Sequence, residues 1–414
     1  MFMRLAFKSL VNRKGSVLLT LMAMTVSIFV LLGVEHIRHQ AKESFGNTVS
    51  GVDLIVGART GSLNLLLYSV FHIGTPTNNI SWESFEDIAS DPNVEWTIPI
   101  ALGDSHKGFR VMGTAQDYFE HFSYGNRHKL EFTQGKPFSD VFDVVLGSEV
   151  AKKLGYGLGD QLVLAHGIAA TSFSLHDDRP FTVVGILAPT GTPVDQTLHV
   201  SLRGIEAIHI DWQQGVKMPG STITIAQIEQ MDLTPKSITA FLVGLKSRIA
   251  TFSVQRQINN FAKEPLSAIL PGAALSELWQ MMSVLENTLR LVSLLVLVSS
   301  LLGLSAMLLA SIREREREVI LLRSIGASPL FLFLLIELEA LFVSIAGIAL
   351  GAGLLSAVLM FLQGYFVSHF GLSLSMNIFS GSSLFMLAVV LVLSAFSAAI
   401  PAVSVYRRAR SCQA

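Results

Sequence analysis

The stretch LVSLLVLVSSLLGLSAMLLASI, residues 291–312, is followed directly by REREREVILLRSIGAS, residues 313–328. The first stretch contains 22 residues and no Asp, Glu, Lys or Arg. A helix needs about 20 apolar residues to cross the hydrocarbon core of a bilayer. Within lipid, a single segment satisfies its backbone polar groups only as a helix. We therefore predict a membrane-spanning helix that ends where the arginines and glutamates begin.

Three further apolar runs predict three further spans. Val17–Val34 and Leu384–Val405 carry no charged residue, whereas Leu330–Leu362 contains Glu337 and Glu339. With their flanks, the four spans are assigned to residues 17–38, 288–312, 330–362 and 384–405. Half of all residues are hydrophobic, only 15% are charged and the mean hydropathy is +0.52, which is too apolar for an ordinary soluble protein.

The basic residues predict the orientation of the spans. They gather in an amphipathic N-terminal segment (1–16), in the 313–329 connection and in the 406–414 tail. Lys and Arg favour the cytoplasmic ends of spans, and four spans place all three segments on one side. We expect both termini to be cytoplasmic, with residues 39–287 and 363–383 outside. No small-residue cleavage site follows the first apolar run, so we read it as an uncleaved anchor.

The large outer segment shows alternating strand and helix patterns. The predicted fold class is an α+β membrane protein: four transmembrane helices with a large extracytoplasmic α+β domain between helices 1 and 2. Ser81 is a predicted N-cap, and Cys412 is the only cysteine, so the outer domain has no disulfide. No basic tract suits nucleic acid. We predict strands at 93–102, 109–114, 143–147, 161–165, 181–187, 197–202 and 238–245, and helices at 81–90, 148–154 and 247–263.

The arginine–glutamate segment predicts a short charged helix beneath the membrane. Arg313 and Glu316, and Glu314 and Arg317, are three residues apart and can pair on a helix surface. Gly326 is a reasonable C-cap. Such a helix is a surface that a motor subunit could push; the alternative is a solvated loop that only sets topology.

The same segment resembles the signature of MacB/FtsX-type ABC permeases, as does the closing Ile400-Pro401-Ala402. The outer domain resembles the MacB-like periplasmic core at Val145-Leu146-Gly147-Ser148-Glu149 and at Phe181-Thr182-Val183-Val184-Gly185-Ile186. The resemblance implies a bacterial inner-membrane dimer, with a second copy of this chain or a related permease, and separate ABC ATPases. It also implies a mechanism, mechanotransmission, in which ATP-driven closure moves the outer domain. The residues it assigns to ATPase coupling are Arg313, Glu314, Arg315, Glu316, Arg317, Glu318, Leu322, Arg323 and Gly326.

The partners and cofactors follow from this resemblance. The sequence contains no Gly-x-x-x-x-Gly-Lys-Ser/Thr phosphate loop, so we expect ATP and Mg in a partner chain and no cofactor here. A periplasmic adaptor or substrate protein is a further expected partner. One alternative is an FtsX-like regulator that controls an outer enzyme or senses a ligand. A membrane-embedded enzyme is a weaker alternative, because no catalytic motif occurs.

Two groups of polar residues near the spans have competing interpretations. Glu337 and Glu339 would suit a proton or cation path, but we favour a structural pairing with Arg or a backbone donor. His36, His39 and Glu43 have spacing that would suit a divalent metal, but we favour a polar helix end and predict no metal there. In the third span, close helix packing, tilt or a kink is expected at Gly347, Gly351 and Gly353.

Overall fold

The computed structural model describes most of the chain and divides it into two compact units. A helical unit comprises 1–41, 282–365 and 374–414, and an outer unit comprises 42–281 and 366–373. The structure describes all residues except 1, 2, 4, 5, 7, 9, 12, 168–178, 211, 214, 215, 218–224, 229, 315–319, 322, 323, 325, 371–374 and 412–414; of 47, 212, 213, 216, 217, 225, 226, 364–370 and 404–411 it describes the backbone alone.

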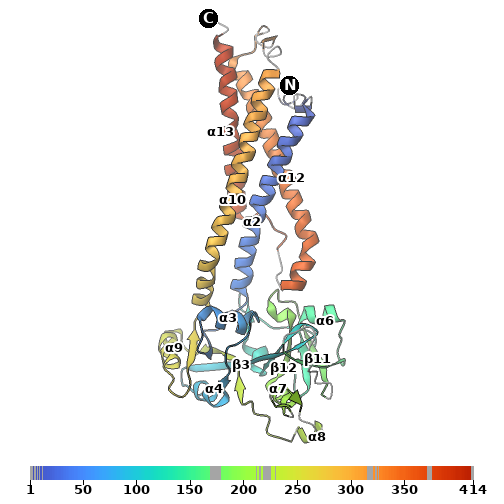
Figure 1. Cartoon of the computed structure of the whole chain (residues 1–414), viewed down its shortest axis with the longest axis vertical. Helices are drawn as coiled ribbons and strands as arrows, with labels where there is room; N and C mark the ends of the chain where they lie inside the picture. Colours follow the sequence, from blue (N-terminus) through green and yellow to red (C-terminus); the bar gives the residue numbers. More distant parts are fainter. Residues whose placement is uncertain are drawn as a thin grey trace. The chain divides into compact units, whose positions relative to one another are not determined.

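The outer unit is built on a mixed sheet of eleven strands (Figure 1). Nine strands follow the order β17-β1-β16-β3-β4-β12-β8-β11-β7, while β10 pairs with β3 and β9 with β11. The β12–β4 and β11–β8 pairs are parallel, and the other pairs are antiparallel. The strands are β1 (Leu54–Ala58), β3 (Val94–His106), β4 (Phe109–Thr114), β7 (Phe132–Gly135), β8 (Asp143–Leu146), β9 (Gln161–Leu162), β10 (Ala165–His166), β11 (Phe181–Leu187), β12 (Thr197–Ser201), β16 (Ala240–Leu245) and β17 (Leu266–Ile269).

Helices and short pairs surround this sheet. Three two-stranded pairs lie outside it: β2 (Ile80–Ser81) with β15 (Ser237–Ile238), β5 (Ser123–Tyr124) with β6 (His128–Lys129), and β13 (Trp212–Gln213) with β14 (Val216–Lys217). The helices are α3 (Ser62–Val70), α4 (Trp82–Ala89), α5 (Asp117–His121), α6 (Ser148–Leu154), α7 (Leu202–His209), α8 (Ile225–Ile228) and α9 (Thr251–Asn259), with 3-10 turns η1 (Pro193–Gln196) and η2 (Arg248–Ala250).

The sheet is buried on both faces. Along β1, Ile55 packs into one hydrophobic cluster while its neighbours Leu54 and Val56 pack into another. Strand β16 repeats this alternation, with Leu242 in the first cluster and Phe241 in the second. Successive strand residues point to opposite faces, so the continuous apolar runs of these strands reflect two covered faces.

Two helices that directly follow a strand begin with a serine N-cap. The Ser81 hydroxyl accepts a hydrogen bond from the Ser84 amide at 3.3 Å, which confirms the predicted N-cap of α4. Ser201 does the same for α7, accepting from the Gly204 amide at 2.9 Å. Each cap satisfies an amide that would otherwise lack a partner in the first helical turn.

Four predicted outer elements are wrong in extent. The strand expected at 93–102 continues to His106 as β3, because residues 104–106 also pair with β10 and β4. The helix expected at 247–263 is the shorter α9, which ends at Asn259 because the backbone leaves helical geometry at Asn260. The strand expected at 238–245 is divided at Thr239, because Ile238 belongs to β15 and pairs with β2, whereas β16 pairs with β1 and β3. The strand expected at 161–165 is two short strands, because β9 pairs with β11 and β10 pairs with β3.

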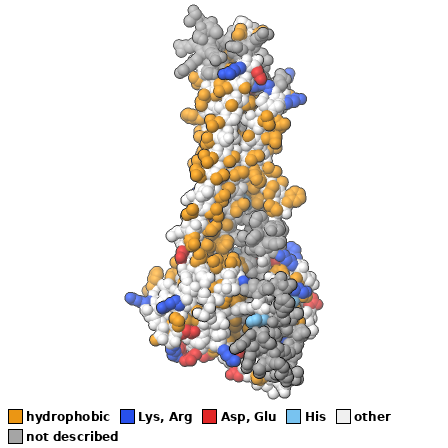
Figure 2. Space-filling model, in the orientation of Figure 1, with side chains coloured by type: hydrophobic (Ala, Val, Ile, Leu, Met, Phe, Trp, Pro, Cys, Tyr) orange, Lys and Arg blue, Asp and Glu red, His pale blue; other side chains and the backbone are white. Residues whose placement is uncertain are grey.

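The helical unit contains four long helices that lie alongside one another (Figure 1). All four are long and apolar enough to cross a membrane. Figure 2 shows that hydrophobic side chains cover most of the visible face of these helices. They are α2 (Lys14–Asn47), α10 (Pro271–Glu314), α12 (Pro329–Phe370) and α13 (Gly381–Ser411).

Helix α12 packs closely on α2 through two glycines. A Cβ added at Gly351 would lie 2.8 Å from Ile28 Cγ2, and one at Gly347 would lie 2.6 Å from Met24 Cγ. Close packing is therefore what these two glycines permit, as expected. At Gly353 a Cβ would meet nothing within 4 Å, so this third glycine has no such role.

Candidate functional site

The arginine–glutamate segment begins where α10 ends. Arg313 and Glu314 form the last turn of α10, and both are exposed. Gly326 has a φ of +96°, the left-handed conformation that favours glycine at a helix C-terminus. Arg315, Glu316, Arg317, Glu318, Leu322 and Arg323 lie outside the described residues.

The helix ends next to the basic segments lie at one end of the helical unit. The start of α2, the end of α10, the start of α12 and the end of α13 are all found there (Figure 1). Lys14, the first residue of α2, is exposed, as is Lys8 before it. This arrangement is the one that the positive-inside rule requires of four spans.

An ion pair joins the N-terminal segment to the third long helix. Arg13 Nη2 donates a hydrogen bond to Glu339 Oε2 at 3.0 Å, and the two side chains are only 11% and 3% exposed. Glu339 thus pairs with an arginine, which is the structural role that we favour for it over a proton or cation path. The Oε1 atom of Glu337 is buried, with no hydrogen-bond partner in the described part of the chain.

A second charged cluster joins α2 to α10. Arg38 donates two hydrogen bonds to the buried Glu35, and its Nη1 lies 3.8 Å from Glu286 Oε2. Arg290 Nη2 reaches Glu35 Oε2 at 3.5 Å. Removing one member of a buried pair leaves the other charge uncompensated, so this cluster fixes how the two helices face each other.

Sequence reasoning expected Glu339 to pair with an arginine or a backbone donor but did not identify Arg13, and it missed the cluster around Glu35. For that cluster the signals were present: Glu35 and Arg38 are three apart, and Glu286 and Arg290 are four apart, so each pair shares a helix face. What the sequence did not supply was the pairing of the two helices.

The local histidine group lies on α2, and its members differ in exposure. His36 is 4% exposed, whereas His39 and Glu43 are exposed. The groups of metal-type ligand atoms found in the described part of the chain include none of the three.

Comparisons with known proteins match both parts of the chain. The family model described as the MacB-like periplasmic core domain matches residues 17–261, more than half of the chain. The model described as the FtsX-like permease C-terminal matches residues 290–409. No curated protein matches.

Two solved structures are among those similar to the outer part. The periplasmic region of MacB from Actinobacillus actinomycetemcomitans is 12% identical, with a TM-score of 0.33, over 56% of this chain and 94% of that one. The extracellular domain of the noncanonic ABC-type transporter YknZ from Gram-positive bacteria is 13% identical, with a TM-score of 0.29, over 53% of this chain and 98% of that one.

Proposed function

Because this chain belongs to the MacB/FtsX family of ABC transporter permeases, we propose that it transmits the ATP-driven motion of a separate ATPase across the membrane to its outer unit. Members of this family work with ABC ATPases. In this proposal the chain crosses the bacterial inner membrane four times with both termini in the cytoplasm. It acts as a dimer with a second permease copy, and its own residues perform no catalysis.

The continuity of α10 carries this proposal. Helix α10 runs unbroken from Pro271 to Glu314 and contributes residues to both units. Its last turn begins the arginine–glutamate segment, which is the proposed docking surface for the ATPase. Displacement of one end of a continuous helix displaces the residues further along it, so force applied near Glu314 would reach the outer unit.

Helix α2 gives the motion a second route. It also contributes residues to both units, and it is tied to α10 through the Glu35–Arg290 contact. A pull on α10 would therefore be shared with α2 rather than dissipated between them.

Site-specific photo-crosslinking tests the proposal. A photoreactive residue at Glu314 is expected to crosslink to the ATPase encoded with this permease when the two are expressed together. The matched control is Ile249, which is 93% exposed and belongs to the outer unit. It should give no ATPase product. Crosslinking of the ATPase at Ile249, or its absence at Glu314 in an ATP-hydrolysing complex, would contradict the proposal.

A further inference from the structure

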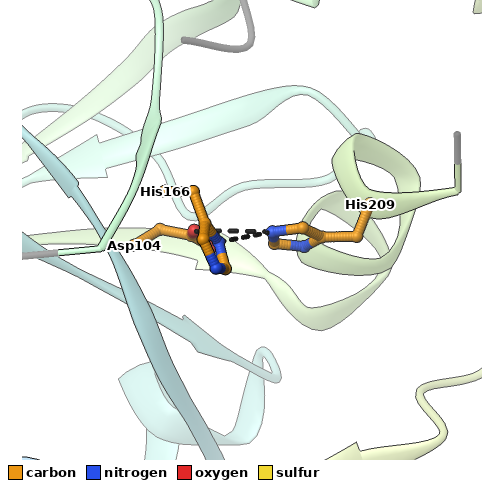
Figure 3. A group of neighbouring side chains, drawn as sticks. All are labelled: Asp104, His166 and His209. Atoms are coloured by element: carbon orange, nitrogen blue, oxygen red, sulfur yellow. Dashed lines mark hydrogen bonds and ion pairs between the residues drawn. The ribbon is translucent and has the colours of Figure 1, made fainter. Parts of the chain in front are cut away.

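Three side chains with metal-binding atoms converge in the outer unit. Along the sequence they are distant from the charged residues of the helical unit described above. Asp104 lies on β3, His166 on β10 and His209 in the last turn of α7 (Figure 3). The Asp104 side chain is 3% exposed, whereas those of His166 and His209 are 46% and 28% exposed. The carboxylate is thus held inside, and the two rings face it from the solvent side.

The sheet itself builds this cluster. Asp104 and His166 are direct partners in the antiparallel β3–β10 pair. The register of β3 against β4 shifts between Leu102 and Ser105, so Asp104 lies in a bulge. Bulges re-aim side chains, and this one accompanies a carboxylate that faces two histidines.

The distances fit a tetrahedral metal. His166 Nδ1 and His209 Nε2 lie 3.2 and 3.5 Å from Asp104 Oδ1, and 3.2 Å from each other. Zinc binds His nitrogen and carboxylate oxygen at 2.0–2.2 Å, which places two ligand atoms of a tetrahedron about 3.4 Å apart. The three atoms therefore already form one face of a zinc-sized tetrahedron.

A hydrogen bond from His209 Nδ1 fixes the ring so that Nε2 is available as a metal ligand. His209 Nδ1 lies 2.8 Å from the carbonyl oxygen of Ile205, an acceptor, so Nδ1 carries the proton and donates it. In the neutral ring, Nε2 then presents its lone pair to the Asp104 carboxylate. A cation between these two atoms, either a metal ion or the second proton of an imidazolium, would satisfy both, and a backbone carbonyl behind a histidine ligand is the usual support of a metal site.

We propose that Asp104, His166 and His209 bind a divalent transition-metal ion of the zinc class, with water in the fourth position. Imidazole ligands favour Zn²⁺, Cu²⁺ or Ni²⁺. Ca²⁺ and Mg²⁺ are disfavoured, because they take six or more oxygen ligands. Water as the fourth ligand agrees with the partial exposure of the two rings, 46% for His166 and 28% for His209.

A second group in the same unit provides the control. Asp117, Glu120 and His121 also bring ligand atoms together, but the two acids are exposed and all three lie on the short helix α5. His121 stacks on Trp96 with ring centroids 5.3 Å apart, so its ring has a packing role. His121→Gln thus removes a histidine of the outer unit without touching the proposed site.

Cobalt substitution tests the site. The full-length, tag-free protein in detergent is treated with a chelator and titrated with Co²⁺, whose visible absorption is intense in tetrahedral sites and weak in octahedral ones. We expect one tetrahedral Co²⁺ per chain, displaced by Zn²⁺ and retained in excess Mg²⁺. His166→Gln and Asp104→Asn should each weaken Co²⁺ binding at least about tenfold, whereas His121→Gln should bind as the wild type does.

His166→Gln is expected to fold normally, because the His166 ring is nearly half exposed, so weaker binding by this variant would not be due to misfolding. Without metal, this variant should unfold at the wild-type temperature, and added Zn²⁺ should raise the unfolding temperature of the wild type alone. The proposal is overturned if wild-type protein shows only weak octahedral absorption. It is equally overturned if both ligand variants keep wild-type affinity, which would place the bound ion elsewhere.

Discussion

Replacing Gly351 by alanine should weaken the packing of α12 on α2. The added Cβ would lie 2.8 Å from Ile28 Cγ2, 2.9 Å from Ile28 Cβ and 3.0 Å from the carbonyl oxygen of Thr25. Ile28 is fully buried, and the carbonyl is part of the α2 backbone. Neither atom is the free end of a flexible side chain, so the helices themselves must separate.

The magnitude follows from comparison with Gly353. Overpacking a well-filled contact costs about 1–3 kcal/mol, while alanine gains up to about 1 kcal/mol over glycine in helix propensity. Gly353→Ala should show only the gain in helix propensity, because its Cβ would meet nothing within 4 Å. The difference between the two variants therefore isolates the packing cost, which we expect to be about 1–3 kcal/mol. Gly347→Ala should fall between them, because its nearest contact is Met24 Cγ, in an adaptable side chain.

The assay is the unfolding free energy of the full chain in mixed micelles, measured by steric trapping with one label on α2 and one on α12. Ile28→Ala combined with Gly351→Ala should cost less than the sum of the two single changes, since alanine lacks the Cγ2 atom that would lie 2.8 Å from the added Cβ. Equal unfolding free energies for Gly351→Ala and Gly353→Ala, within about 0.5 kcal/mol, would refute the reasoning.

Three further predictions concern the charged and buried groups. Glu339→Gln removes the carboxylate that pairs with Arg13, so it should lower the unfolding free energy by up to about 3 kcal/mol in the same micelle assay. Glu337→Gln should leave the unfolding free energy nearly unchanged, because Glu337 Oε1 has no hydrogen-bond partner in the described residues. Glu35→Gln should lower permease-stimulated ATP hydrolysis in the reconstituted complex without loss of ATPase binding; unchanged stimulation would separate this contact from transmission. Burial lowers the pKa of His199 to about 3, so the unfolded chain takes up this proton first as the pH falls below about 6.5. His199 alone should therefore make the outer unit about 2 kcal/mol less stable at pH 5 than at pH 7, as measured by tryptophan fluorescence in denaturant. His199→Leu should remove that contribution, and an unchanged pH slope in this variant would contradict it.

Local sequence patterns predicted helices and strands accurately where nearby residues mark the ends of these elements. The strand at 109–114, the helix at 148–154 and the strand at 181–187 have the bounds that the sequence indicated. Gly108 and Gly155, both with positive φ, mark two of these ends. Apolar length alone likewise predicted four helices able to span a membrane.

The sites could not be predicted in the same way, because they depend on pairing between distant segments. Asp104 and His166 are 62 residues apart and meet only through the β3–β10 register. Arg13 and Glu339 are separated by 326 residues. In contrast, the His36, His39 and Glu43 spacing was a purely local signal, and the described residues show no metal group there.

The contacts within the helical unit differ in strength, and this difference bears on how it would move. Helix α12 is held to α2 by close glycine packing and to Arg13, the residue before α2, by a buried ion pair. Helix α10 meets α13 through the Ser305 and Ser397 hydroxyls, 2.6 Å apart. Hydroxyl bonds between membrane helices contribute only about 0.6 kcal/mol each. We therefore expect α2 and α12 to move as one body and α10 to be the helix that shifts. The Glu35–Arg290 contact and the two hydrogen bonds between α2 and α10, Ser27 to Val296 and Ser300 to Met24, must then either carry α2 along with a shift of α10 or break.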